Sequence, residues 1–268
     1  MGKWLKASLV VVGAVVFSTV AINASDVFRG IEGSLSGLAI QSSGPCGPNA
    51  VLLQLSSGAL CVDTYEASAG DSCDVADPKS EVDTEVNINN GSCAAVSLPE
   101  VVPWRFVSMT QAQQLCARSG KRLLTNAEWY YTALGMGDMS SCAIDTGGQT
   151  RLTGTSKCIT PAGVHDMIGN VWEWVSGEVS DGQYNGTTLP ESGYVSLVSS
   201  DGVVLETSER PQSDFGEDYA WSDSTSVRGM LRGGFYGSDT DAGVFTLNAS
   251  VPLNFKTNGV GFRCAQDI

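Results

Sequence analysis

The sequence predicts a loop-rich α+β domain with two main helices and several short strands. Two capping-box patterns, each followed by an apolar helical face, indicate helices between residues 110 and 135. After Gly135 the helical periodicity stops, and short apolar segments alternate with stretches rich in Ser, Asp and Gly. The 31 glycines and the charged fraction of 16% are typical of a folded domain with many turns, and not of a disordered chain.

The first helix is expected to start at a capping box formed by Thr110 and Gln113, and Gly120 can end it. Its inner face would carry Ala112, Leu115, Cys116 and Ser119. This spacing places the four side chains on one side of a helix, as a helix that covers a core requires.

The second helix is expected from about Asn126, because Thr125 and Glu128 repeat the capping-box pattern. Trp129 and Ala133 are four residues apart and would lie together on its inner face.

The segment before the helices contains a predicted strand and a polar loop. Residues 59–68 alternate enough to form a strand, whereas residues 69–97 are polar and rich in turn residues. Cys73 and Cys93 bracket this second stretch, so a disulfide between them would staple a surface loop.

The N-terminus predicts an exported protein, either secreted or displayed at the cell surface. A short basic region and a 16-residue uncharged, largely apolar run precede small residues near Ala21 and Ala24. Residues 1–24 are therefore a signal peptide or an N-terminal anchor that attaches the protein to a membrane. Residues 25–57 would form a stalk, and residues 58–268 the folded domain. The even count of eight cysteines indicates disulfides in an exported chain, but leaves their pairing open.

The formal net charge of −14 excludes nucleic acid as a direct partner, because phosphate contacts need a basic surface. Solubility explains such acidity, and cation binding is the alternative.

Five motifs occur in an order that resembles a known family. They are "CVDTYEAS", "VSMTQAQQLCARSGKRLLTNAEWYYTAL", "GVHDMIGNVWEWVSGE", "LRGGFY" and "GVGFRCA". In this order they resemble the formylglycine-generating-enzyme/sulfatase-modifying domain, a variant of the C-type lectin fold, from about residue 59 to 267. The resemblance implies helices packed on twisted antiparallel sheets, with much of the chain in ordered loops.

The resemblance also implies a structural calcium ion and one disulfide. Carboxylate and backbone oxygens at close spacing suit calcium, although a capped turn is the alternative for these residues. Carried over by position, the calcium ligands are the Asp166 and Glu173 side chains with the Gly169 and Val171 carbonyls. The implied disulfide joins Cys116 to Cys264.

The catalytic residues of the formylglycine generators are absent. Ser238 and Gly243 occupy the positions of the two copper-binding cysteines, and neither can supply a thiolate. The single histidine, His165, is interpreted as a packed strand residue, and Arg232 and Arg263 as framework residues. We expect no enzymatic activity; the alternative is an enzyme of this family with altered chemistry.

Residues 231–265 resemble the C-terminal variable region of proteins that are diversified by retroelements and share this fold. The residue types expected from such variation form a predicted ligand-binding face, here called the display face: Phe235, Tyr236, Gly237, Ser238, Asp239, Asp241, Thr246, Asn248, Ser250, Asn254, Phe255 and Asn258. The fixed scaffold between them would be Ala242, Gly243, Val244, Phe245, Leu247 and Pro252.

The composition of the display face is that of an adaptable binding surface. Aromatic rings give contact area at low entropic cost, and Ser, Asp and Asn give adaptable hydrogen bonds. The predicted function is an exported display protein that binds a protein or glycan ligand on a cell or virion surface. A lectin-like binding module without diversification is a further alternative.

Overall fold

The computed structural model describes residues 44–137 and 139–268. The predicted signal or anchor, residues 1–24, and the first part of the predicted stalk lie outside the described residues. Within the described part of the chain, no helix is long and apolar enough to cross a membrane.

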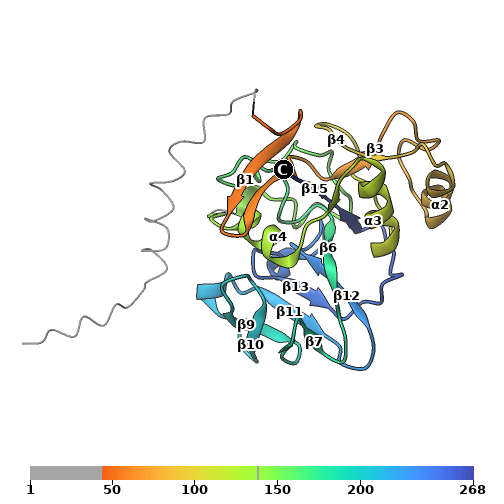
Figure 1. Ribbon diagram of the computed structural model, residues 1–268. Helices are drawn as coiled ribbons and strands as arrows, with labels where there is room; N and C mark the ends of the chain where they lie inside the picture. The colour runs from red at the N-terminus through yellow and green to blue at the C-terminus, as the bar shows by residue number, and fades with distance from the viewer. Residues whose placement is uncertain (1–43, 138) are drawn as a thin grey trace, which may run out of the picture. The chain divides into compact units, whose positions relative to one another are not determined.

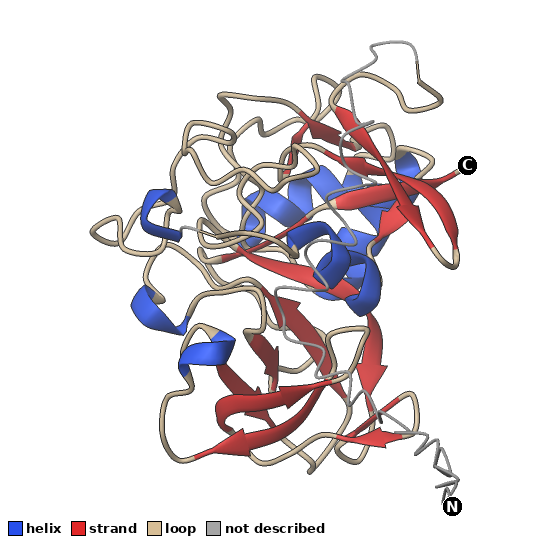
Figure 2. Ribbon diagram, turned by 90° about the vertical axis from the view of Figure 1, so that its left-hand side faces the viewer, coloured by secondary structure: helices blue, strands red, loops and turns tan. Residues whose placement is uncertain are grey.

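The described residues form the predicted α+β class, with three α-helices, several 3-10 turns and four sheets joined by long loops (Figures 1 and 2). The helices are α2 (Glu81–Asn89), α3 (Met109–Arg118) and α4 (Asn126–Ala133), and the 3-10 turns are η1 (Met139–Ser141), η2 (Ser213–Phe215) and η3 (Asp239–Asp241). Two short pairs are β3 (Ala67–Ala69) with β4 (Ala95–Ser97) and β7 (Gln183–Tyr184) with β8 (Thr187–Thr188).

A four-stranded sheet joins the start and the end of the domain. Its order is β1 (Ala50–Leu55), β2 (Gly58–Asp63), β15 (Cys264–Asp267) and β5 (Arg122–Leu123), all antiparallel. The expected boundary at residue 58 falls inside the β1–β2 hairpin. The folded domain therefore begins earlier than predicted, because residues 50–55 of the expected stalk pair with β2.

A seven-stranded mixed sheet forms the rest of the framework. Its order is β10 (Val204–Ser208), β9 (Gly193–Val198), β11 (Tyr219–Ser222), β13 (Leu247–Ala249), β12 (Arg228–Arg232), β6 (Trp172–Val179) and β14 (Val260–Phe262). One face carries Val175, Met230 and Leu247 into a first core cluster. The other face carries Trp174 and Leu231 into a second cluster beneath α3. Alternation of side chains along each strand produces this division.

The capping boxes explain where α3 and α4 begin. Thr125 caps α4 with Glu128, and Trp129 is fully buried, as predicted. The first box is wrong by two residues: Ser108 caps α3, and Gln111 completes the box. The earlier start places Met109 in the first turn, where its side chain is 2% exposed. Burial of Met109 therefore favours the box of Ser108 and Gln111 over the overlapping pattern of Thr110 and Gln113.

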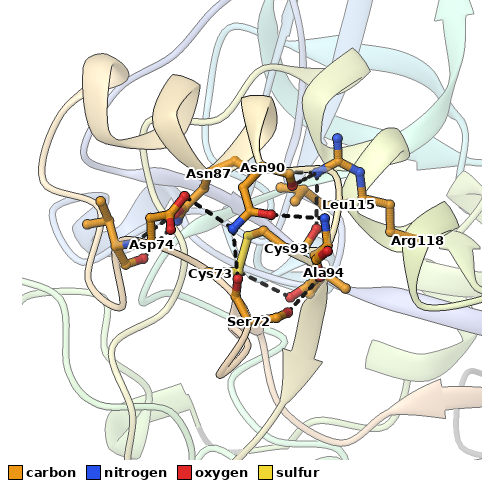
Figure 3. Close-up of a disulfide and its surroundings, with 12 residues drawn as sticks. Ser72, Cys73, Asp74, Asn87, Asn90, Cys93, Ala94, Leu115 and Arg118 are labelled. Carbon is orange, nitrogen blue, oxygen red and sulfur yellow. Dashed lines mark hydrogen bonds between the residues drawn. A yellow bond between two sulfur atoms is a disulfide. The ribbon is translucent and has the colours of Figure 1, made fainter.

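A third helix, α2, lies within residues 69–97, for which a polar loop is predicted. The Cys73–Cys93 disulfide closes this stretch, as the bracketing cysteines suggested (Figure 3). The Arg118 guanidinium of α3 donates to the carbonyl oxygens of Ile88, at 2.7 Å, and Asn90, at 2.9 Å. The bond to Ile88 satisfies a carbonyl at the C-terminal end of α2, and the bond to Asn90 adds to the one that this carbonyl accepts from Cys93 N–H.

All eight cysteines are paired. The implied bridge Cys116–Cys264 is present and spans 148 residues, tying α3 to the last strand. The remaining pairs, which the sequence left open, are Cys46–Cys61 and Cys142–Cys158, in addition to Cys73–Cys93.

Candidate functional site

A buried ion pair lies at the turn between residues 166 and 173. Glu173 is 1% exposed, and its Oε1 accepts hydrogen bonds from Arg263 Nε at 3.0 Å and Nη2 at 2.8 Å. Its Oε2 accepts from Trp129 Nε1 at 2.8 Å. Burial raises the pKa of Glu173, and the Arg263 guanidinium acts in the opposite direction. Arg263 is therefore a framework residue, as predicted.

The same turn is held by two further buried carboxylates. Asp166 accepts hydrogen bonds from the Ser156 hydroxyl and, at 2.6 Å, from Gly154 N–H. Glu66, which sequence reasoning missed, accepts from Asn170 Nδ2 at 2.5 Å and Val171 N–H at 3.2 Å. Burial, with the nearby negative charges of Asp166 and Glu173, raises the pKa of Glu66 well above its usual range.

These residues do not fit the calcium site that the resemblance implies. All four carboxylate oxygens of Asp166 and Glu173 already accept protein donors, and Arg263 supplies the positive charge beside Glu173. Within the described residues, no three acidic, His or Cys side chains converge to hold a metal ion. We therefore assign no role to calcium.

The display face begins at a tight double-glycine turn. Gly233 and Gly234 have positive φ angles of 86° and 82°. A Cβ atom at Gly233 would lie 2.5 Å from the Met167 carbonyl oxygen, so this turn has no room for a side chain.

The loop that follows is fixed by its backbone. Tyr236 N–H donates to the Asn170 carbonyl at 3.0 Å, and the Tyr236 carbonyl accepts from Thr146 N–H at 3.1 Å. Asp239 N–H donates to the Ile144 carbonyl at 3.0 Å. Backbone bonds to segments far away in sequence therefore hold residues 235–241, and the exposed positions of this loop are Gly237, Asp239 and Thr240.

The structure places most of the predicted display residues at the surface. The exposed members are Gly237, Asp239, Asn254 and Asn258, and the half-buried members are Phe235, Ser238, Asp241, Asn248, Ser250 and Phe255. Two assignments are wrong. Tyr236 is 5% exposed and Thr246 is fully buried, so neither can contact a ligand in this conformation. Thr246 instead donates its hydroxyl to the Asp241 carbonyl at 2.8 Å.

The surface residues form two groups that meet at aromatic side chains. One group is the loop from residue 235 to 241, and the other extends from Asn248 on β13 to Asn258. Phe235 and Phe255 both pack at the margin of the second core cluster. Phe235 also lies over Gly259, where an added Cβ would be 2.6 Å from its ring.

The scaffold after the loop depends on a buried carboxylate, Asp218, which gave no sequence signal. Its Oδ2 accepts a hydrogen bond from Phe245 N–H at 2.6 Å. Burial raises the pKa of Asp218 to about 7, although Phe245 N–H and Arg232 oppose the shift. Gly243 is obligatory here, because a Cβ atom at this position would overlap both Asp218 oxygens.

Arg232 and His165 both occupy framework positions. Arg232 is fully buried, donates to the Val244 carbonyl at 2.9 Å and lies over the Trp129 ring at 4.9 Å. His165 packs against the Tyr65 ring at 5.0 Å, and burial lowers its pKa. Its carbonyl accepts from Arg263 at 2.7 Å. Both contacts agree with the packed role expected for this histidine.

The arrangement is a C-type lectin-like α+β domain with an exposed, backbone-anchored C-terminal loop. Residues 149–268 match the family model described as the sulfatase-modifying factor enzyme 1-like domain, which confirms the resemblance for this part of the chain. No curated protein matches the chain.

Several solved structures are similar to the chain at low identity. They include the Major Tropism Determinant I1 variant (13% identity, TM-score 0.44), variable protein 1 of Treponema denticola (14%, 0.45) and PvdO from Pseudomonas aeruginosa (18%, 0.42). These matches cover 84%, 83% and 79% of this chain and 54%, 92% and 82% of the respective structures. The chain thus spans about half the length of the Major Tropism Determinant structure.

Proposed function

We propose that the protein is a non-enzymatic display protein whose C-terminal region is diversified to bind varied ligands. The observation that carries this proposal is the loop from residue 235 to 241. Long-range backbone bonds fix its conformation, while the Gly237 and Asp239 positions are exposed. A loop held by its backbone can accept changes at its exposed positions, which a diversified binding surface requires.

The chemistry of the site supports binding over catalysis. Every cysteine of the chain is in a disulfide, so no thiolate is free to hold copper or act as a nucleophile. Gly243, which replaces one family cysteine, has no space for any side chain. Copper-dependent oxidation of a cysteine peptide by the purified protein would overturn this part of the proposal.

The four disulfides support an oxidising location, and thus secretion or surface display through the N-terminal segment as signal or anchor. The ligand is a protein or glycan on a cell or virion surface. Labelling of intact cells with an antibody against residues 58–268 tests whether the domain is displayed at the surface. Secretion and display are both contradicted if the antibody detects the protein only after the cells are lysed and detects none in the medium.

Diversification is tested in the DNA that surrounds the coding sequence. We expect a nearby near-copy of codons 231–265 that differs mainly at adenines and lies beside a reverse-transcriptase gene. The differences should concentrate at the exposed and half-buried display positions and spare the buried Gly233, Gly243 and Arg232. If no such copy exists, the diversification proposal fails.

A further inference from the structure

One face of the seven-stranded sheet, the face of the second core cluster, is covered by a helix at one end only. Helix α3 packs against β6 on this face, whereas β9 and β11 lie toward the opposite edge (Figure 1). On these two strands Val195 and Ala220 point into the first core cluster. Their neighbours in sequence point to the opposite face, and three of them are partly exposed aromatic residues: Tyr194, Tyr219 and Trp221.

These three side chains, here called the aromatic row, contact one another across the strands. The ring centroids of Tyr194 and Tyr219 are 5.2 Å apart, and those of Tyr219 and Trp221 are 4.7 Å apart. The Trp221 ring continues to Trp172 at 5.9 Å. A soluble domain that leaves three adjoining aromatic rings partly exposed has a surface suited to a partner.

The aromatic row is continuous with the display face. Trp221 pairs in register with Asn248, one of the predicted display residues, on the neighbouring strand. At the other end, Trp172 N–H donates to the Gly259 carbonyl at 2.8 Å, and the Phe235 ring lies over the same glycine. A ligand on the display face therefore reaches the row without crossing another element.

The segment that carries the row is strongly acidic. Residues 189–228 contain eight acidic and two basic residues. One basic residue is neutralised, because Arg228 pairs with Asp223 at 2.5 Å. The exposed acidic residues of this segment are Glu191, Glu206, Glu209, Asp214 and Glu217. The segment therefore carries a net negative charge, which favours a basic partner over an acidic one.

We propose that the aromatic row is a constant part of the binding surface and takes a lysine- or arginine-bearing segment of a partner protein. This inference rests on the proposed function and names the chemistry of its ligand. A cation over a Tyr or Trp ring is attracted by the negative face of the ring, and the net negative charge of the segment and of the chain attracts basic segments.

Other occupants fit less well. A second copy of this chain carries the same charge of −14 and would be repelled, as would an anionic glycan. A neutral glycan gains nothing from the negative potential. Adjacent rings of the row are inclined at 80° and 47°, so they form no single flat platform for a sugar.

The test is an NMR titration of the ¹⁵N-labelled full-length chain. The probes are a hexa-arginine peptide, a hexaglutamine peptide and the neutral oligosaccharide maltohexaose. We expect hexa-arginine to shift the Trp221 indole signal and the amides of Tyr219 and Asn248, and hexaglutamine and maltohexaose to leave them unchanged. Shifts confined to other acidic surfaces, such as Glu81 and Glu85 on α2, overturn the proposal. Shifts of the row by maltohexaose alone overturn it in favour of a glycan site.

Matched substitutions separate the rings from the general charge. Trp221→Leu and Tyr219→Leu keep apolar volume but remove the π face, and should weaken hexa-arginine binding about three- to tenfold. Tyr219→Phe should keep parental affinity. Tyr131→Leu removes a half-buried ring on α4 that does not belong to the row, and serves as the control. Equal effects of Trp221→Leu and Tyr131→Leu, with unchanged melting temperatures, overturn the proposal.

The two proposals fail in different experiments. Absence of a near-copy of codons 231–265 removes diversification and leaves this titration unaffected. A failed titration removes the cationic partner and leaves the DNA result standing.

Discussion

Replacing Arg263 by methionine tests whether an internal ion pair, and not a calcium ion, holds the turn between residues 166 and 173. In the parent, Arg263 donates two hydrogen bonds to Glu173 and one each to the carbonyls of Asp63, at 3.0 Å, and His165, at 2.7 Å. Methionine fills much of the same volume and provides none of them. Glu173 would keep only its bond from Trp129.

The expected cost follows from the burial of both partners. The side chains are 0% and 1% exposed, so the remaining carboxylate has no access to water. Removing one member of a buried pair costs about 3–5 kcal/mol. For a domain of this size each kcal/mol lowers the melting temperature by about 2–4 °C, so we expect a fall of roughly 6–20 °C.

Thermal unfolding followed by tryptophan fluorescence measures this fall, with and without calcium. The double variant Arg263→Met, Glu173→Gln should be more stable than the sum of the single effects predicts, because the uncompensated charge is gone. Loss of less than about 1 kcal/mol in the single variant would refute the reasoning. A marked fall in the melting temperature of the parent protein on adding a chelator would also refute it. A bound calcium ion would then supply the stability that is assigned here to Arg263.

Three further predictions concern the scaffold around the display face. Because burial raises the pKa of Asp218 to about 7, the folded state binds a proton that the unfolded state releases near pH 4. Stability should therefore fall by up to about 4 kcal/mol between pH 4 and 7, and Asp218→Asn should flatten this dependence in urea titrations. Converting Cys116 and Cys264 together to alanine should cost about 2–5 kcal/mol in the same assay, and an unchanged midpoint would contradict the bridge. Gly243→Ala should be strongly destabilising, whereas Thr240→Ala, at an exposed position of the loop, should stay within about 0.5 kcal/mol of the parent by calorimetry.

The helices show what local sequence can and cannot predict. Thr125 and Glu128 identify α4 correctly, because a capping box is a local signal and nothing nearby competes with it. At α3 two boxes overlap, and only the burial of Met109 within the tertiary structure selects the one that begins at Ser108.

Helix α2 was missed because its apolar pattern does not point inward. Val82 is 71% exposed, while the polar Thr84 and Asn87 are fully buried. Contacts from outside the helix hold it, including the bonds from Arg118 and the Cys73–Cys93 bridge (Figure 3). Periodicity cannot reveal a helix whose stability comes from partners elsewhere in the chain.

The residue types of the candidate site could be predicted from the sequence, but which of its side chains point outward could not. Residue types identified the loop that contains Gly237 and Asp239, but could not show that Tyr236, just before Gly237, is buried. The supporting carboxylates gave no local signal at all. Glu66 lies 104 residues from the Asn170 side chain that it binds, so only the folded chain brings the two together.

The position of β15 has a consequence for any variation upstream of it. This strand, the last in the chain, lies between β2 and β5, and its first residue closes the bridge to Cys116. A copy of the region before it that carried a frameshift, a stop codon or a changed length would lose the strand or shift its pairing, and with it the closure of the sheet. If the region is diversified as proposed, folding would then admit only in-frame copies that keep β15 and its pairing.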